Sequence, residues 1–174
     1  MNLTTLLASL LLAPTAFAAG SPQRLGKTVL LARPTRTSAC VRGALPDRRC
    51  SPGAYYAGVT KAVLCSPAFQ PSNIRAMTKQ LKHAVEIAYG MAPRKYHRTL
   101  EIDYIVPLEL GGANNLANLF PESQTADPGY LAKDRLELKL HDLVCAGKMT
   151  LTTARQSIAA NWISLYRSVF GATP

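Results

Sequence analysis

The apolar residues of this chain recur at spacings that predict a definite order of elements. Residues 72–90 carry them every three or four positions, as do residues 129–145 and residues from about 152 to 169, which predicts three helices. Residues 101–106 are β-prone and begin by alternating polar with apolar side chains, and residues 118–120 can return as a second short strand. The order helix, strand, loop, strand, helix, helix predicts an α+β fold.

The apolar run at the start of the chain has a different character. Residues 3–18 are uncharged, dominated by Leu and Ala, and end in Ala-Phe-Ala, the small-x-small pattern that a signal peptidase recognises. Residues 1–18 are therefore predicted to be a signal peptide cleaved before Ala19. The alternative, an uncleaved anchor, is disfavoured because the run is shorter than about 20 residues and contains Pro14. We expect a secreted or periplasmic protein with no stable membrane span.

The chain carries a large positive net charge. The chain holds 20 Lys and Arg against 10 Asp and Glu, a net charge of +10, and all of these residues lie beyond residue 18. Such a balance indicates polyanionic partners, namely nucleic acid, anionic lipid headgroups or acidic glycans, although solubility alone is the alternative. Residues 19–39 are interpreted as a basic N-terminal arm, with one possible strand at 28–32, and residues 40–174 as one domain.

Four cysteines are expected to form disulfides in an oxidising compartment, and three pairings are possible. The Cys50–Cys65 pair is favoured because a turn-rich segment lies between them, which leaves Cys40–Cys145. A structural zinc site is disfavoured because no two cysteines have the short spacing that such sites use. These bridges predict a stapled, irregular segment over residues 40–71.

The helix at 129–145 carries candidate chemistry. Asp134, Glu137 and His141 fall within about 60° of arc when the sequence is projected on a helix. Two carboxylates and an imidazole on one line could converge on Mg²⁺, Mn²⁺ or Zn²⁺. The alternative is an ordinary surface stripe in which the acids pair with nearby Lys or Arg.

The segment before this helix carries a specific motif. Residues 101–122 contain an acidic residue, Asp103, Ile-Val-Pro-Leu, a Gly-Gly turn and Asn-Leu, and they resemble the hairpin of HNH nucleases, the ββα-metal family. The chain is more similar still to a group of small exported bacterial HNH-like proteins. The resemblance covers about residues 40–167 and is specific from 99 to 162. Its further matches are Lys133-Asp134, Glu137, Leu140-His141, Val144-Cys145-Ala146-Gly147 and Ala154 to Trp162.

This resemblance implies a ββα-metal hairpin and helix packed by flanking helices, with a bound divalent metal ion and no small-molecule cofactor. Asp103 would be a metal ligand on the first strand. Asn118 would tie the two arms of the hairpin together and orient the site. Asp134, Glu137 and His141 would supply the remaining metal or phosphate contacts.

The chain departs from the family at one catalytic position. Where the family has its general-base histidine, immediately after Asp103, this sequence has Tyr104. An ordinary tyrosine has a pKa near 10 and is a poor base at neutral pH. Two hypotheses follow: a metal-dependent, sequence-nonspecific nuclease in which Tyr104 alters or weakens catalysis, or a non-catalytic binding protein for nucleic acid or another polyanion.

Basic residues cluster where a nucleic-acid backbone could pass. Arg94, Lys95 and Arg98 precede the hairpin, and Lys133 lies on the helix with Arg135 and Lys139. Because Lys and Arg neutralise phosphates without reading bases, binding is expected to be nonspecific and sensitive to salt.

Overall fold

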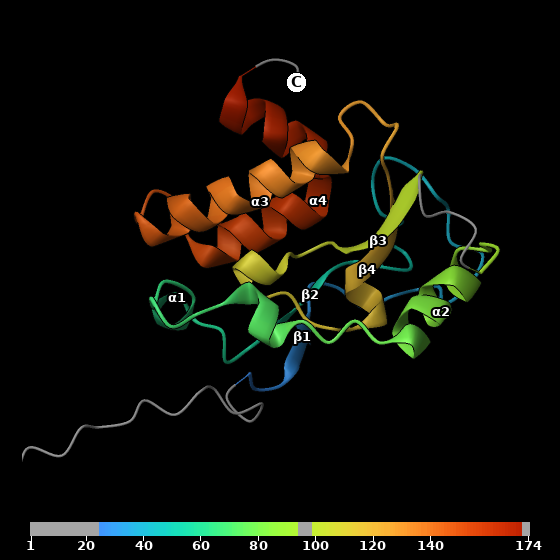
Figure 1. Cartoon of the computed structure of the whole chain (residues 1–174), viewed down its shortest axis with the longest axis horizontal. Coiled ribbons are helices and arrows are strands. Elements are labelled where there is room, and N and C mark those ends of the chain that lie inside the picture. The colour runs from blue at the N-terminus through green and yellow to red at the C-terminus, as the bar shows by residue number, and fades with distance from the viewer. Residues whose placement is uncertain (1–24, 94–98, 172–174) are drawn as a thin grey trace, which may run out of the picture.

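A computed structural model describes residues 25–93 and 99–171 (Figure 1). The predicted signal peptide and the basic residues Arg94, Lys95 and Arg98 lie outside these residues. Within them, no helix is long and apolar enough to cross a membrane. The elements in chain order are β1 (Thr28–Leu30), β2 (Ala54–Tyr56), α1 (Lys61–Leu64), η2 (Pro71–Ile74), α2 (Lys79–Ala88), β3 (Leu100–Tyr104), η3 (Leu108–Leu110), η4 (Leu116–Asn118), β4 (Leu119–Ser123), α3 (Tyr130–Cys145) and α4 (Leu151–Phe170).

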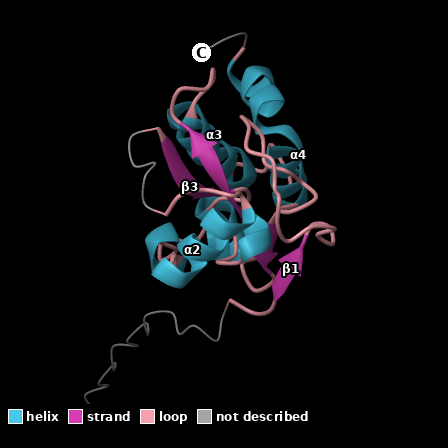
Figure 2. Ribbon diagram, turned by 90° about the vertical axis from the view of Figure 1, so that its right-hand side faces the viewer, coloured by secondary structure: helices cyan, strands magenta, loops and turns pink. Residues whose placement is uncertain are grey.

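The fold mixes helices with two small antiparallel sheets, which confirms the broad α+β class. β1 pairs with β2, and β3 pairs with β4 in a hairpin whose register places Glu101 opposite Glu122. An isolated bridge between Tyr55 and Gly112 links β2 to the connection between β3 and β4. Figures 1 and 2 show the β3–β4 hairpin between α2 on one side and the α3–α4 pair on the other. The hairpin therefore has helices on both flanks.

The first predicted helix is shorter than the sequence indicated. Instead of one helix from residue 72, the chain forms the 3₁₀ turn η2 and then α2, whose first turn is capped where the Thr78 hydroxyl accepts from the Leu81 N–H at 3.1 Å. Asn114 explains the break: its side chain accepts from the Ala76 N–H at 2.7 Å and donates to the Ile74 carbonyl at 2.7 Å. These backbone groups bond to Asn114 in place of helical partners.

The two C-terminal helices form close to where the spacing predicted them. α3 ends at Cys145, and Gly147 follows the cap residue with a φ of 73°, which suits a residue without Cβ. α4 is interrupted at Asn161, whose side chain accepts from the Ser164 N–H at 2.9 Å and so caps the second half. Buried Trp162 donates its indole N–H to the Ala44 carbonyl at 3.0 Å, which ties α4 to the stapled segment.

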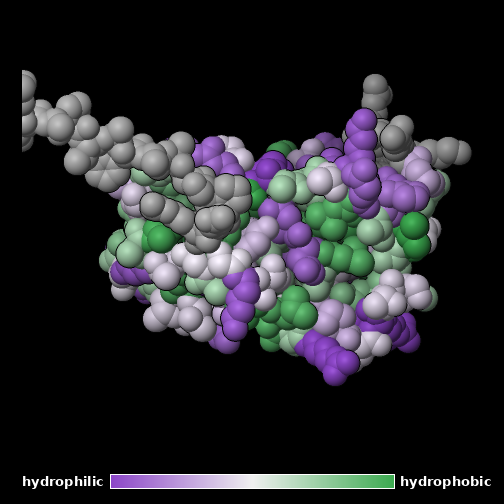
Figure 3. Space-filling model, turned by 90° about the horizontal axis from the view of Figure 1, so that it is seen from below, coloured by the Kyte–Doolittle hydropathy of each residue, from purple (hydrophilic) through white to green (hydrophobic). Residues whose placement is uncertain are grey.

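The surface is mixed in character. Figure 3 shows hydrophilic side chains interspersed with hydrophobic ones over one face of the molecule. Among the large apolar residues that stay exposed are Leu131 and Leu138 on α3. They lie one heptad apart, on the side of the helix away from its buried Leu136 and Leu140.

Both disulfides form, but the predicted pairing is wrong: the bridges are Cys40–Cys50 and Cys65–Cys145, not Cys50–Cys65 and Cys40–Cys145. Asp47 closes the first loop by accepting from the Val41 and Arg49 N–H groups at 3.1 Å each. After Cys50 the chain continues into β2, which carries it away from that cysteine to pair with β1. α1 then delivers Cys65 to the end of α3.

Serine variants of each bridge test this pairing. Cys65–Cys145 closes a separation of 80 residues and Cys40–Cys50 one of 10. Since the entropy that a cross-link removes from the unfolded chain grows with loop length, losing the longer bridge is expected to cost about 2 kcal/mol more, within a typical range of about 2–5 kcal/mol. Urea unfolding of the two double-serine variants measures this. Peptide mapping that recovers a Cys50–Cys65 peptide pair contradicts the structure.

Candidate functional site

The hairpin gathers carboxylates on one face. Glu101 and Asp103 are two residues apart on β3, so their side chains point to the same side of the strand. Glu122 lies directly opposite Glu101 on β4. One carboxylate oxygen from each of the three lies within 4.8 Å of the others. Like charges opposite each other destabilise a strand pair, so this face needs a compensating cation.

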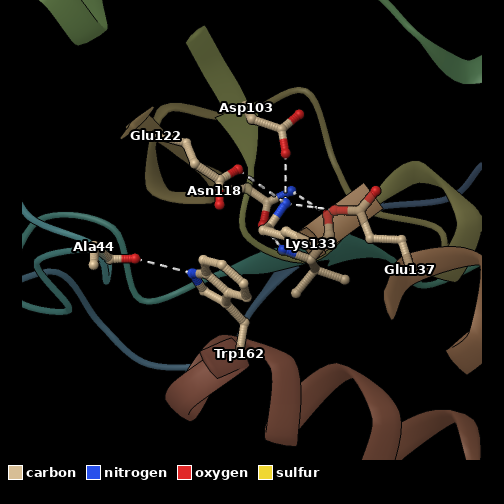
Figure 4. Close-up of polar contacts among 8 residues, drawn as sticks. Ala44, Asp103, Asn118, Glu122, Lys133, Glu137 and Trp162 are labelled. Atoms are coloured by element: carbon tan, nitrogen blue, oxygen red, sulfur yellow. Dashed lines mark hydrogen bonds and ion pairs between the residues drawn. The ribbon is translucent and has the colours of Figure 1, made fainter. Parts of the chain in front are cut away.

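Lys133 supplies a positive charge from α3. Its ammonium group donates to Oδ2 of Asp103 and Oε1 of Glu137 and lies 3.6 Å from Oε2 of Glu122 (Figure 4). Burial by itself lowers the pKa of this lysine, but the surrounding carboxylates, Asp103 first, raise it well above its usual value. The side chain is 1% exposed, so the expectation that Lys133 contacts nucleic-acid phosphates is wrong.

Glu122 is the most unusual acid in this cluster. It is 1% exposed, and neither of its carboxylate oxygens has a hydrogen-bond partner among the described residues. Burial raises the pKa of Glu122 to about 8 although nearby Lys133 opposes the shift. A buried acceptor without a partner is rare in folded proteins and calls for an explanation.

Asn118 holds the hairpin arms together as predicted. Its Oδ1 accepts from the Val106 N–H at 2.8 Å and the Ala54 N–H at 3.0 Å. Its Nδ2 donates to the carbonyls of Val106 and Ala113, each at 3.0 Å. The side chain is fully buried, and these four bonds join the segment that follows β3, the segment that precedes β4, and β2.

Tyr104 has the geometry of a hydrogen-bond donor. Its hydroxyl donates to Oδ1 of Asn114 at 2.7 Å, and the guanidinium of Arg75 lies 5.5 Å from the ring centroid. Burial raises the pKa of Tyr104 to about 12, although Arg75 opposes the shift. The phenol is therefore protonated at neutral pH, which is not the form that accepts a proton from water.

A cleft of about 1090 Å³ lies over the hairpin between α2 and α3. One side carries the basic wall, defined as Arg75, Lys79 and Lys82, all exposed. The acidic floor, defined as Glu101, Asp103 and Asp134, lines the same cleft. Burial, followed by the charges of neighbouring carboxylates, raises the pKa of Glu101 and of Asp134. Opposite charges thus line one opening.

The three helix residues predicted as ligands do not all meet there. Asp134 and Glu137 line the cleft with Asp103, as expected, although Glu137 is bonded to Lys133. The prediction that His141 is a ligand at this site is wrong, because its Nε2 lies 3.3 Å from the Leu64 carbonyl and 3.8 Å from Sγ of Cys145. Seven residues along a helix carry a side chain about 10 Å down the axis, which moves His141 toward α1.

The sequence prediction missed Glu122 and the basic wall. Glu101 is identified by the motif as its acidic residue, but the position of Glu122 opposite Glu101 follows only from the strand register.

Comparison of this chain with protein-family models, with curated proteins and with solved structures found no match.

Proposed function

We propose that this protein is an exported phosphodiester hydrolase that cleaves nucleic acid with a divalent cation and with little sequence preference. The observation that carries the proposal is the cleft in which the basic wall and the acidic floor line one opening. Two disulfides and no free cysteine favour a secreted or periplasmic location, because such bridges persist in oxidising compartments. The hairpin followed by α3 supports a ββα-metal core.

The acidic residues suit a divalent cation by their chemistry. Carboxylate oxygens are the ligands that Mg²⁺ and Mn²⁺ prefer, and the cluster on β3 and β4 offers three of them within 4.8 Å. When bound, such an ion would neutralise the negative charge that develops on the leaving oxygen of a phosphodiester. Asp103 is the residue we assign to it, and Asn118 positions Asp103 by fixing the hairpin.

The basic wall supplies the substrate contacts in this proposal. Arg75, Lys79 and Lys82 are exposed along the cleft and can neutralise successive phosphates of a nucleic-acid strand. Contacts to phosphates position a strand without reading bases, so cleavage should show little sequence preference.

A second candidate function is binding of nucleic acid or another polyanion without hydrolysis. One observation favours it: the Tyr104 hydroxyl donates to Asn114 and stays protonated at neutral pH. A site that binds a strand but activates water poorly turns over slowly. The two candidates share the cleft and differ in whether a phosphodiester bond breaks.

The basic wall is tested by salt dependence. Replacing Arg75, Lys79 and Lys82 together by Ala is expected to reduce the slope of log K against log salt for duplex DNA by about 2–3, since each lost phosphate contact removes about 0.9. Fluorescence anisotropy with a labelled oligonucleotide at about 50 to 200 mM salt measures it. The matched control replaces Lys61, Lys148 and Arg167, which are exposed and do not line the cleft. Equal slopes for the two triple variants remove the basic wall from the interface.

A further inference from the structure

The structure points to a specific cation site on the hairpin, where Glu101 and Asp103 line the cleft and Glu122 is buried beside them. We propose that the divalent ion is held by the hairpin alone, through Glu101, Asp103 and Glu122, while α3 contributes the ammonium of Lys133 in place of a ligand. This inference deepens the proposed function, on which its biological meaning rests, and it replaces the helix ligand set predicted from the sequence.

The strand register builds this site. Glu101 and Asp103 lie on the same face of β3, and Glu122 lies across from Glu101 on β4. Their nearest carboxylate oxygens lie within 4.8 Å of one another, a separation that a single ion can bridge. Because Asn118 fixes the arms of the hairpin by four hydrogen bonds, the three ligands are held by a rigid support.

Glu122 gives an independent reason to expect a ligand. Its carboxyl group is almost completely buried, and neither oxygen has a hydrogen-bond partner among the described residues. The ammonium of Lys133 lies 3.6 Å away, beyond hydrogen-bond distance. A buried acceptor in this condition lacks a partner that a cation at the cluster would provide.

Two of the three predicted helix ligands, Glu137 and His141, have other contacts. The ammonium of Lys133 donates to Oδ2 of Asp103 and Oε1 of Glu137, so Glu137 balances the lysine. Among the described residues, no hydrogen bond engages the second oxygen of Asp103. His141 contacts the Leu64 carbonyl and the Cys65–Cys145 bridge. Three carboxylates without imidazole or thiolate favour Mg²⁺ or Mn²⁺ over Zn²⁺.

Mn²⁺ binding to the oxidised full chain tests the site without any nucleic acid. Glu101→Gln, Asp103→Asn and Glu122→Gln are each expected to weaken Mn²⁺ affinity at least about tenfold, measured by electron paramagnetic resonance of free Mn²⁺. His141→Ala and the charge-matched control Asp142→Asn, on the exposed side of α3, should stay within about twofold of the wild type. Glu101 is half-buried, so Glu101→Gln keeps the test valid if Glu122→Gln fails to fold.

The outcomes separate this inference from the proposed function. Wild-type affinity in Glu101→Gln and Asp103→Asn, or a loss confined to His141→Ala, overturns the hairpin site. Cleavage that persists in EDTA, by a chain that binds no Mn²⁺, overturns the site and leaves a hydrolase. Mn²⁺ binding that depends on the three acids, by a chain that cleaves nothing, supports the site and removes the hydrolase.

Discussion

Replacing Lys133 by methionine is expected to lower the free energy of unfolding by about 3–5 kcal/mol. The ammonium is 1% exposed and bonds to Asp103 and Glu137, with Glu122 at 3.6 Å. Removing it leaves these acids near one another without their cation, and uncompensated buried charge is among the most destabilising changes a protein can suffer. Urea unfolding followed by circular dichroism measures the effect.

A matched control is Lys139→Met, which removes the same group from an exposed position of α3 and should change stability by less than about 0.5 kcal/mol. If Lys133→Met does not fold, the double variant with Glu137→Gln removes one charge of each sign and should recover part of the loss. Equal stabilities for Lys133→Met and Lys139→Met contradict the buried ion cluster.

Changing Tyr104→His is expected to raise the rate of DNA cleavage by about 10²–10⁴-fold. Tyr104 lies beside Asp103 and lines the cleft, but its protonated hydroxyl donates to Asn114. An imidazole at this position has an ordinary pKa near 6.5 and can accept a proton from water at neutral pH. Burial and nearby Arg75 disfavour the charged imidazolium, and Asp103 opposes them by favouring it. Single-turnover cleavage of a labelled duplex in Mn²⁺ measures the rate.

Tyr104→Phe is the control, because it removes the hydroxyl and adds no base, and it should give no such gain. If the phenol were itself the working group, both changes would lower the rate and phenylalanine would lower it further. A cleavage rate that falls in both variants therefore contradicts the prediction that an imidazole at residue 104 supplies a missing base.

The elements predicted well from the sequence are those set by local patterns. Both C-terminal helices, α3 and α4, form near the expected residues. Their signals, the apolar spacing and the glycine at residue 147, lie within a short stretch of the sequence. The break before α2 was missed because Asn114, 40 residues beyond Ile74, takes the backbone bonds. The disulfide pairing was missed for the same reason, since it depends on where β2 and α1 carry the chain.

In the candidate site too, local contacts were predicted from the sequence and distant contacts were missed. Asn118 has its predicted contacts because they are bonds between neighbouring parts of one hairpin. His141 was grouped with Asp134 because a helical projection shows angle and hides the rise along the axis. Lys133 was assigned to the surface because lysine is rarely fully buried unless paired, and its partners come from two other elements. Glu122 could not be assigned without the register of β4 against β3.

Cleavage of plasmid DNA by the oxidised chain, in Mg²⁺ or Mn²⁺ and in EDTA, tests the central claim that the hairpin cleft hydrolyses phosphodiester bonds with a divalent cation. The wild type and the exposed control Asp142→Asn should both cleave with metal and stop in EDTA. Asp103→Asn should lose cleavage while remaining folded by circular dichroism. If the folded wild type cleaves no DNA or RNA with Mg²⁺, Mn²⁺ or Zn²⁺, or if Asp103→Asn cleaves as fast as the wild type, the claim is contradicted.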